Sequence, residues 1–440
     1  MLRSTQNIPN RNITDVQRYF WRNYLAHSIE GGLYMGGLSF LAAETVMPAM
    51  VKDLGGPNWL ISLMPMMLMF GIGWPSLLTA HWVEHLPRVK PFILATGLLQ
   101  RLPYLIAVLS LFFLFDKHPV LVLILVALTP LLSGVLTGLN FAAWMDLIAR
   151  IIPEKRRASA WAIRWIITAI IGIFAGGIIQ SVLARSPGPP GYGILHLIAF
   201  GFCMLSYILQ AMFHEIPSTY QTDLPGRGLV ENLRSLPGLL RADRRFLNFI
   251  SMRMLTMGIY IMTPFLAIHA LTILGKDEYY LGFFVTAQMV GGILGNLIAG
   301  YLGDHLGSRI PLVLARLILV AVSIGVAVNR FEWGFLVIFF LFGFAFYMDR
   351  VGTSTLSIEI CPADRIPTYI SLLTTLMSPS MLVAAVISTL VRELTGQLMP
   401  AALLSATTVM LSLIFLSRIE EPRKKTGVDN GGNLVPGNDC

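Results

Sequence analysis

The 440-residue chain contains few charged residues and few cysteines. Asp, Glu, Lys and Arg make up 13% of it, about half of their usual share in soluble domains. A soluble chain of this length would need more polar surface, so the composition excludes an ordinary soluble protein. The three cysteines, Cys203, Cys361 and Cys440, are scattered, which excludes a disulfide framework and a cysteine metal site.

Sequence motifs of catalysis are missing as well. The chain has no G-x-x-x-x-G-K-S/T loop, so it is not expected to use ATP directly. It has no H-E-x-x-H motif, and its apolar segments hold no Ser/His/Asp set and no cysteine in the setting of a nucleophile. We therefore expect a protein that is not an enzyme and that needs neither a cofactor nor a metal ion.

Long apolar segments are the main feature that the sequence does have. Hydrophobic residues reach 55%, and the mean hydropathy is +0.69. About 20 helical residues cross the ~30 Å core of a bilayer. Twelve segments approximate this length: 24–51, 59–80, 91–115, 119–149, 158–183, 194–213, 246–271, 279–302, 310–328, 335–358, 368–391 and 400–416.

A polar stretch, 214–245, divides these spans into six and six. It carries prolines, glycines and arginines, and is interpreted as a linker with an interfacial helix. The expected parts are a cytoplasmic N-terminal segment (1–23), a first six-helix bundle (24–213), the cytoplasmic linker (214–245), a second six-helix bundle (246–417) and a disordered cytoplasmic tail (418–440).

Arginine and lysine are concentrated in alternate loops. Arg88 with Lys90, and Arg150 with Lys155, stand in one set of loops, whereas each loop of the other set holds a single basic residue. The positive-inside rule places the basic loops and both termini in the cytoplasm. This pattern accounts for the net charge of +8 without a nucleic-acid partner. We expect an integral protein of the plasma, or bacterial inner, membrane, with the lipid bilayer as its surroundings.

A short polar turn occurs once in each half of the chain. Residues 300–309 read GYLGDHLGSR, and a fainter copy, AHWVEHLPRVK, spans residues 80–90. Each copy follows the second apolar span of its half, at an offset of 300 − 80 = 220 residues. The chain is therefore interpreted as a tandem repeat of membrane segments.

Twelve spans in two halves, a basic central loop and this turn resemble the major facilitator superfamily. The family's signature for the turn is G-x-L-x-D-x-x-G-x-R. The second copy meets it with Gly300, Leu302, Asp304, Gly307 and Arg309. The first copy departs from it, with Ala80, Glu84 and Pro87 in place of Gly, Asp and Gly.

The resemblance implies an all-α membrane protein with twelve transmembrane helices in two pseudo-symmetric six-helix bundles. It also implies alternating access, in which two halves rock about a central site at mid-membrane depth. A further signature of drug/proton antiporters, G-x-x-x-G-P-x-x-G-G, is only partly met by residues 168–177. Small residues in this stretch are better explained by close helix packing. We expect a monomer.

Ionisable residues within the spans are the candidates for chemistry. Each costs at least ~2.5–3.5 kcal/mol to insert, so it should face a cavity or a partner. The candidates for substrate binding and proton coupling are Glu30, Glu44, Arg101, Arg164, Arg253, Asp349 and Arg350. Arg164 and Arg316 could instead extend to the lipid headgroups, and Asp146 and Arg150 should form a local i,i+4 pair.

Two of these groups occupy equivalent places in the repeat. Glu30 and Arg253 lie in the first and seventh spans, and we hypothesise that they face each other across the cavity. Burial favours a protonated carboxyl and a nearby arginine an ionised one, so movement of Arg253 would load or release a proton on Glu30. The alternative is a static ion pair.

Arg101 precedes Pro103 and allows two interpretations. Its guanidinium would bind an anionic group in bidentate fashion, or it would satisfy Glu44 and the backbone carbonyl that the proline leaves free.

The polar turns are predicted to form a cytoplasmic gate. Asp304 and Glu84 should bond to a helix N-terminus, where partial positive charge collects, or to an arginine. Glu84 would meet Arg150, and Arg309 would meet Glu359. The remaining gate candidates are Gly300, Gly307 and Arg88. The alternative is a solvated turn.

The expected function is secondary active transport of a small organic solute, coupled to protons as symport or antiport. Five arginines against four acids within the spans mildly favour an anionic substrate. One alternative is export of amphipathic, drug-like compounds. An alternative of another class is a non-transporting sensor or assembly factor on the same scaffold.

Overall fold

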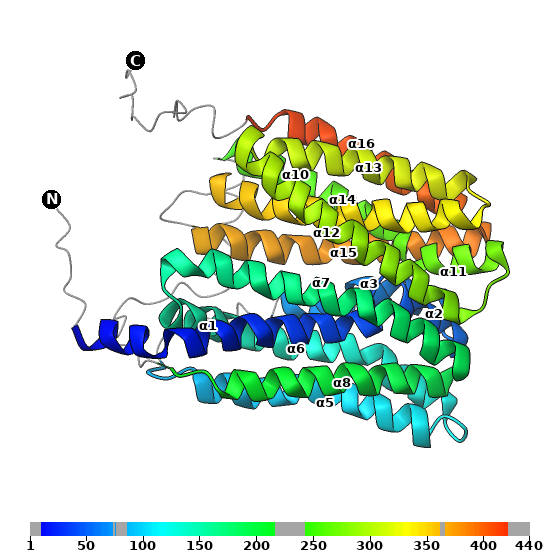
Figure 1. The fold of residues 1–440 in the computed structure, drawn as a ribbon. Coiled ribbons are helices and arrows are strands. Elements are labelled where there is room, and N and C mark those ends of the chain that lie inside the picture. The colour runs from blue at the N-terminus through cyan, green and yellow to red at the C-terminus, as the bar shows by residue number, and fades with distance from the viewer. Residues whose placement is uncertain (1–9, 74, 76–85, 216–242, 361–365, 421–440) are drawn as a thin grey trace, which may run out of the picture. The chain divides into compact units, whose positions relative to one another are not determined.

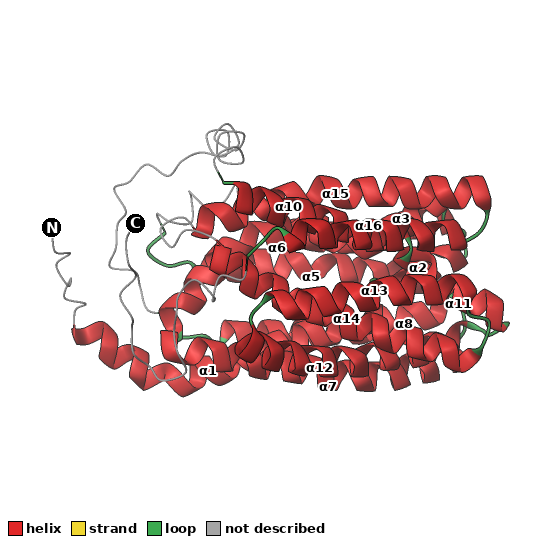
Figure 2. Cartoon of the chain, turned by 90° about the horizontal axis from the view of Figure 1, so that it is seen from above, coloured by secondary structure: helices red, strands yellow, loops and turns green. Residues whose placement is uncertain are grey.

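The computed structural model describes residues 10–73, 75, 86–215, 243–360 and 366–420. Within these ranges the regular structure is helical, and no strand occurs (Figure 2). Nine helices of the described residues are long and apolar enough to cross a membrane. The prediction of an all-α membrane protein is confirmed.

The first half of the chain begins with a broken helix. Its α1 (Asn10–Leu38) leads through the 3-10 turn η1 (Ser39–Leu41) into α2 (Val46–Asp53). The helices that follow, drawn in blue to green in Figure 1, are α3 (Asn58–Gly73), α5 (Lys90–Phe113), α6 (Pro119–Ile151), α7 (Glu154–Arg185) and α8 (Pro189–Ala211).

The second half repeats this pattern, including the break in its first helix. Here α10 (Arg244–Thr256) leads through η2 (Met257–Ile261) into α11 (Thr263–Leu274). The elements that follow are η3 (Glu278–Tyr280), α12 (Leu281–Leu306), α13 (Arg309–Val328), α14 (Glu332–Ile360), α15 (Ile366–Thr395) and α16 (Met399–Ser417). The first and seventh predicted spans are thus each interrupted by a 3-10 turn at related places, and such helices are called jointed below. Interrupted helices are typical of sites in repeat-built membrane proteins.

Local sequence signals explain where the helices begin and end. The α5, α6, α8 and α16 helices each carry proline in the first turn, where the missing N–H leaves no bond unmade. The Asp243 side chain accepts a hydrogen bond from the backbone N–H of Phe246 and caps α10. Gly307 follows α12 with φ of +94°, a left-handed conformation that ends helices and favours glycine.

The chain forms two compact units. Unit 1 comprises Met1–Glu231 with the short segment Gly275–Thr286, and unit 2 comprises Asn232–Leu274 with Ala287–Cys440. In unit 1, α1 packs on α7 and α8, α5 packs on α6 and α8, and α3 packs on α6 (Figure 1). In unit 2, α13 packs on α14 and α16, and α10 packs on α16. The domain boundaries predicted from the sequence stay a prediction, and residues 216–242 of the predicted linker lie outside the described residues.

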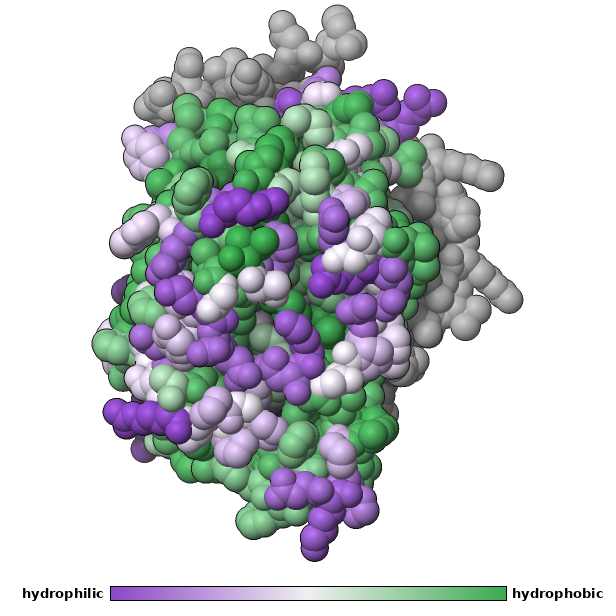
Figure 3. Space-filling view, turned by 90° about the vertical axis from the view of Figure 1, so that its right-hand side faces the viewer, coloured by the Kyte–Doolittle hydropathy of each residue, from purple (hydrophilic) through white to green (hydrophobic). Residues whose placement is uncertain are grey.

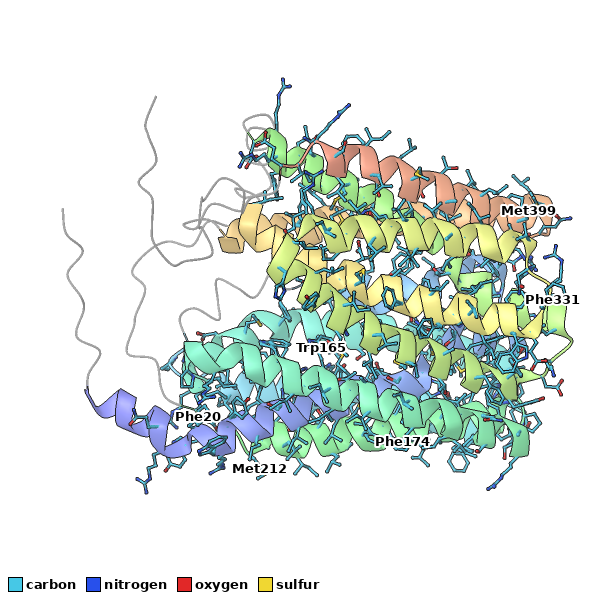
Figure 4. The ribbon with its side chains drawn as sticks, turned by 45° about the horizontal axis from the view of Figure 1, so that its top comes forward. Phe20, Trp165, Phe174, Met212, Phe331 and Met399 are labelled. Carbon is cyan, nitrogen blue, oxygen red and sulfur yellow. The ribbon has the colours of Figure 1, made fainter. Side chains whose placement is uncertain are left out.

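The surface of the helices is apolar along their length and polar at their ends. Large apolar side chains such as Phe174 on α7 (68% exposed) and Met399 on α16 (48% exposed) point away from their helices (Figure 4). Figure 3 looks onto helix ends and shows hydrophilic side chains gathered there. A belt of exposed apolar side chains is what lipid-facing helices require.

Glycines bring pairs of helices into close contact at equivalent places of the repeat. A Cβ atom on Gly134 of α6 would lie 2.4 Å from the carbonyl oxygen of Leu68 on α3. In unit 2, a Cβ atom on Gly291 of α12 would lie 2.0 Å from the carbonyl oxygen of Phe340 on α14. Both contacts join the second helix of a half to its fourth, and only a residue without a side chain fits.

We therefore expect Gly134→Ala to lower the free energy of unfolding by about 1–3 kcal/mol, because the added methyl group meets a backbone that cannot yield. The matched control is Gly177→Ala on α7, where a Cβ would meet no atom within 4 Å. That variant should be neutral or slightly stabilised, since alanine favours helix over glycine. Thermal unfolding of the purified protein in detergent measures both, and equal melting temperatures would contradict the close contact.

Candidate functional site

A buried carboxylate ties three helices of unit 1 together. Glu30 on α1 is 3% exposed. Its Oε2 accepts a hydrogen bond from Nη1 of Arg164 on α7 at 3.2 Å, and its Oε1 accepts one from Oγ of Ser206 on α8 at 3.2 Å. The ion pair is shielded from solvent on both sides, since Arg164 is 5% exposed. The alternative that Arg164 extends to the lipid headgroups is therefore wrong.

A second arginine, Arg101 on α5, connects to the same carboxylate through Ser206. Its Nη2 donates to Oγ of Ser206 at 3.0 Å, its Nε to the carbonyl oxygen of Cys203 at 2.7 Å, and its Nη1 to that of Gly97 at 2.5 Å. The guanidinium also lies 5.5 Å from the ring centre of Tyr34. All three nitrogens are thus bonded within the protein, which argues against anion binding. The carbonyls that they contact are those of Cys203 and Gly97 and not that of Leu99, which Pro103 leaves free.

Unit 2 contains an arginine in the equivalent place. Arg316 on α13 is fully buried, and its Nη1 donates to the carbonyl oxygen of Leu312 at 2.9 Å. Its Nε donates to Oγ of Ser412 on α16 at 3.0 Å, and its Nη2 to Oγ1 of Thr256 on α10 at 3.2 Å. Like Arg101, it bonds to the carbonyl four residues earlier and to a serine on the last helix of its half. The alternative that Arg316 extends to the headgroups is therefore wrong.

The carboxylate of the second cluster comes from a different helix. Asp349 on α14 lies 2.9 Å from Nη1 of Arg316 and accepts a hydrogen bond from Nη1 of Arg253 on α10 at 3.0 Å. Arg253 also donates to Oγ1 of Thr353 at 3.2 Å. Each unit therefore holds two arginines around one acid, but the acid lies on the first helix of unit 1 and on the fourth of unit 2.

Five of the residues that the sequence analysis singled out lie in these clusters, and their roles in substrate binding and proton coupling stay predictions. Glu30, Arg101, Arg164, Arg253 and Asp349 belong to the two clusters. The predicted pairing of Glu30 with Arg253 joins the two units and stays a prediction; each of these residues has an ion-pair partner within its own unit.

Two further candidates lie outside the clusters. Glu44 is half-buried in the turn between η1 and α2, and Arg350 is exposed on α14.

A carboxylate that sequence reasoning missed binds a helix N-terminus of unit 1. Glu215, just after α8, accepts hydrogen bonds from the backbone N–H of Val89 at 2.6 Å and of Lys90 at 3.1 Å, at the start of α5. This is the interaction that the sequence assigned to Glu84, which lies outside the described residues. Arg150 lies 3.7 Å from Glu215 and pairs with Asp146, as the i,i+4 spacing predicted.

The second copy of the polar turn has the backbone that its glycine demands. Gly307 is left-handed between α12 and α13, and Arg309 opens α13. Gly300 lies within α12 with open space beside it. The side chains of Asp304 and Glu359 are not among those the structure describes, and Arg88 is exposed near the first copy. The gate therefore stays a prediction.

A third group of polar residues lies at the opposite ends of the unit 1 helices, and no motif indicated it. The hydroxyl of Tyr192 on α8 donates to Oδ2 of Asp53 at the end of α2, at 2.5 Å. Burial raises the pKa of Asp53 to about 7; the bond from Tyr192 opposes the rise, the carboxylate of Glu278 adds to it, and Lys52 opposes it. Part of the Asp53 side chain still meets solvent.

Comparison with known proteins identifies the scaffold. The family model described as Major Facilitator Superfamily matches residues 31–384 and, again, residues 249–436. The chain belongs to the major facilitator superfamily. No curated protein matches this superfamily member significantly in sequence.

Solved transporter structures share the fold at low sequence identity. The D-xylose-proton symporter superposes with a TM-score of 0.71 at 12% identity, over 92% of this chain and 99% of that one. The nucleoside transporter NupG gives 0.70 at 11% identity, over 90% and 100%. A bacterial homologue of the iron transporter ferroportin in an inward-facing state gives 0.63 at 15% identity, over 91% and 98%. These likenesses establish the fold alone.

In this superfamily member, Ser206→Ala should cost about 1–3 kcal/mol of unfolding free energy, because Arg101 and Glu30 both lose a buried hydrogen-bond partner. Ser181→Ala is the control, since the Ser181 hydroxyl bonds only to the carbonyl of Gly177 on an exposed face. It should change stability by less than about 0.5 kcal/mol. Denaturant or thermal unfolding measures both variants. Similar losses of unfolding free energy would show that the bridging position of Ser206 adds nothing to stability.

The raised pKa of Asp53 predicts a pH dependence of stability. Because the unfolded value is about 3.9 and the folded one about 7, the folded protein binds the proton more tightly. The stability that this tighter proton binding gives the folded protein is fully present below about pH 4. It is lost as the pH rises through about 7. The wild type should therefore lose melting temperature relative to Asp53→Asn between these limits. A difference that stays constant with pH would refute the shift.

Proposed function

We propose that the protein is a secondary active transporter of a small organic solute, which works by alternating access and is coupled to protons. The observation that carries this proposal is the buried Glu30 on the jointed first helix, held by Arg164 and Ser206. Membership of a superfamily of transporters supports the general activity. The names of two structural neighbours, a nucleoside transporter and a sugar-proton symporter, support a small organic solute.

Proton coupling follows from competition for one carboxylate. While Arg164 lies 3.2 Å from Glu30, it supplies the counter-charge of the carboxylate. When a conformational change draws Arg164 away and no other cation replaces it, a proton on Glu30 neutralises the buried carboxylate instead. Return of Arg164 releases it. Asp349, which lies between Arg253 and Arg316, is proposed as a fixed ion pair of unit 2.

The bonding of the arginines removes the reason for an anionic substrate. That preference depended on a surplus of one arginine in the spans. Arg101 is bonded to two carbonyl oxygens and Ser206, Arg164 is paired with Glu30, and Arg253 and Arg316 share Asp349. Four of the five arginines therefore have roles within the protein, and their number says nothing about the substrate's charge.

The remaining features of the proposal rest on the sequence. The positive-inside pattern supports cytoplasmic termini and a plasma, or bacterial inner, membrane. The turn around Asp304 and Arg309 is proposed as part of a cytoplasmic gate, and the protein as a monomer. Export of amphipathic compounds would gain support from accessible methionines, because methionine adapts to varied apolar ligands. Met64, Met66 and Met252 are instead buried in the packing.

The test is proton movement in reconstituted liposomes. Solutes are screened for those that change the internal pH, reported by an entrapped dye, and the active solute is then compared in wild type and Glu30→Gln. The variant should lose solute-driven proton flux at least about tenfold, the contribution typical of a proton-transfer group, yet still exchange labelled solute for unlabelled. Asp116→Asn, an exposed acid in a loop, should behave as wild type.

Unchanged proton flux in Glu30→Gln would remove Glu30 from coupling. If no solute moved through the wild type at all, a non-transporting sensor or assembly factor would become the better-supported function.

A further inference from the structure

The guanidinium of Arg164 lies in a cage of aromatic rings. Its Cζ is 4.9 Å from the ring centre of Trp144 on α6 and 5.3 Å from that of Trp161 on α7. The two indoles meet nearly edge to face, with centres 5.6 Å apart and planes at 80°. Glu30 contacts the guanidinium at 3.2 Å. Ring faces and a carboxylate together form the surroundings that proteins use to recognise organic cations.

His27 adds a third ring to this cage. Its ring centre is 5.6 Å from that of Trp144 and 5.5 Å from that of Trp161. The side chain is fully buried, and neither ring nitrogen has a hydrogen-bond partner among the described residues. Burial of an unpaired polar group is unfavourable, and a ligand beside the indoles could bond to these two ring nitrogens.

The backbone of α1 makes room for the guanidinium. A Cβ atom on Gly31 would lie 1.9 Å from Cζ of Arg164. Any other residue at position 31 would therefore occupy the place where the cation lies. The cage thus has a floor at Gly31, two indole walls, a neighbouring imidazole, and a carboxylate that supplies the counter-charge.

We propose that this cage is a binding site for an organic cation, in which the guanidinium of Arg164 is a built-in competitor. The inference rests on the proposed function and names the substrate class: a small solute with a guanidinium or alkylammonium group. The solute would take the place of Arg164 against Glu30 and the indole faces, with the His27 nitrogens available for its further polar atoms.

Competition between the two cations follows from the charges in the cage. Glu30 offers one negative charge, and the ring faces carry the negative part of the aromatic quadrupole. An anion would meet repulsion from both, whereas a solute cation that replaces the guanidinium of Arg164 leaves the net charge of the cage unchanged. A tethered group acts at an effective concentration that reaches the millimolar range, so free cations should bind the wild type weakly and a chain without Arg164 tightly.

The test is direct binding to the purified full-length protein, with ethylguanidinium as the probe. Ethylurea, which has nearly the same shape and no charge, is the control ligand, and sodium chloride matches the ionic strength. Calorimetry and the shift of the melting temperature measure binding. We expect saturable binding of ethylguanidinium to the wild type, at least about tenfold tighter binding to Arg164→Ala, and no binding of ethylurea.

Two further variants identify the cage as the place of binding. Gly31→Ala puts a methyl group where the cation would lie and should abolish binding. Trp161→Leu removes one wall and should weaken it about tenfold, as expected for a contribution of cation–π contact near 1–2 kcal/mol. Trp59→Leu, at an exposed indole on α3, should leave binding unchanged. Arg164→Lys is a second variant in case Arg164→Ala does not fold. It keeps the positive charge and should still compete with the probe for the cage.

The absence of saturable binding to the wild type would overturn the proposal, even if Arg164→Ala bound the probe. Equal binding of ethylurea, or full binding by Gly31→Ala, would overturn it as well. The transport proposal fails independently of this test: a protein that moves a neutral solute with protons but binds no cation refutes the cage alone, whereas one that binds ethylguanidinium but moves nothing refutes the transport function.

Discussion

A guanidinium buried among apolar helices has to find all of its hydrogen-bond acceptors inside the protein, because lipid offers none. Arg101 and Arg316 meet this demand in the same way, through a carbonyl one turn earlier in their own helix and a serine on another helix. The constraint fixes α5 against α8 and α13 against α16 at one rotation.

The two clusters share these arginines but differ in the helix that supplies the acid. In unit 1 the acid stands on the jointed α1, so movement of that helix changes the surroundings of Glu30. In unit 2 the jointed α10 carries Arg253 instead, and the acid stands on the unbroken α14. The same repeat thus provides a carboxylate that a moving helix can release and one that two arginines hold. This difference is the physical basis for proposing Glu30, rather than Asp349, as the coupling residue.

The sequence predicted those features that depend on neighbours along the chain. Hydropathy predicted the all-α membrane fold, the i,i+4 spacing predicted the pair of Asp146 with Arg150, and the glycine of the polar turn predicted the backbone at Gly307. Partners far apart in the chain were missed. Glu30 and Arg164 are separated by 134 residues, and Glu215 lies 126 residues from Val89, whose backbone N–H it binds at the start of α5. Hydrophobic periodicity gives the face of a helix but not which of five neighbours covers it.

The aromatic cage shows why a count of arginines does not predict the charge of the substrate. Arginines in the spans suggested an anionic substrate only while they were counted as free charges. In the structure, Arg101, Arg164, Arg253 and Arg316 have partners within the protein. A guanidinium that is bonded to a carboxylate and lies on two indole faces is itself the cation of its site. The groups that surround it are therefore complementary to positive charge, and so the residue that first argued for an anionic solute marks a site suited to a cationic one.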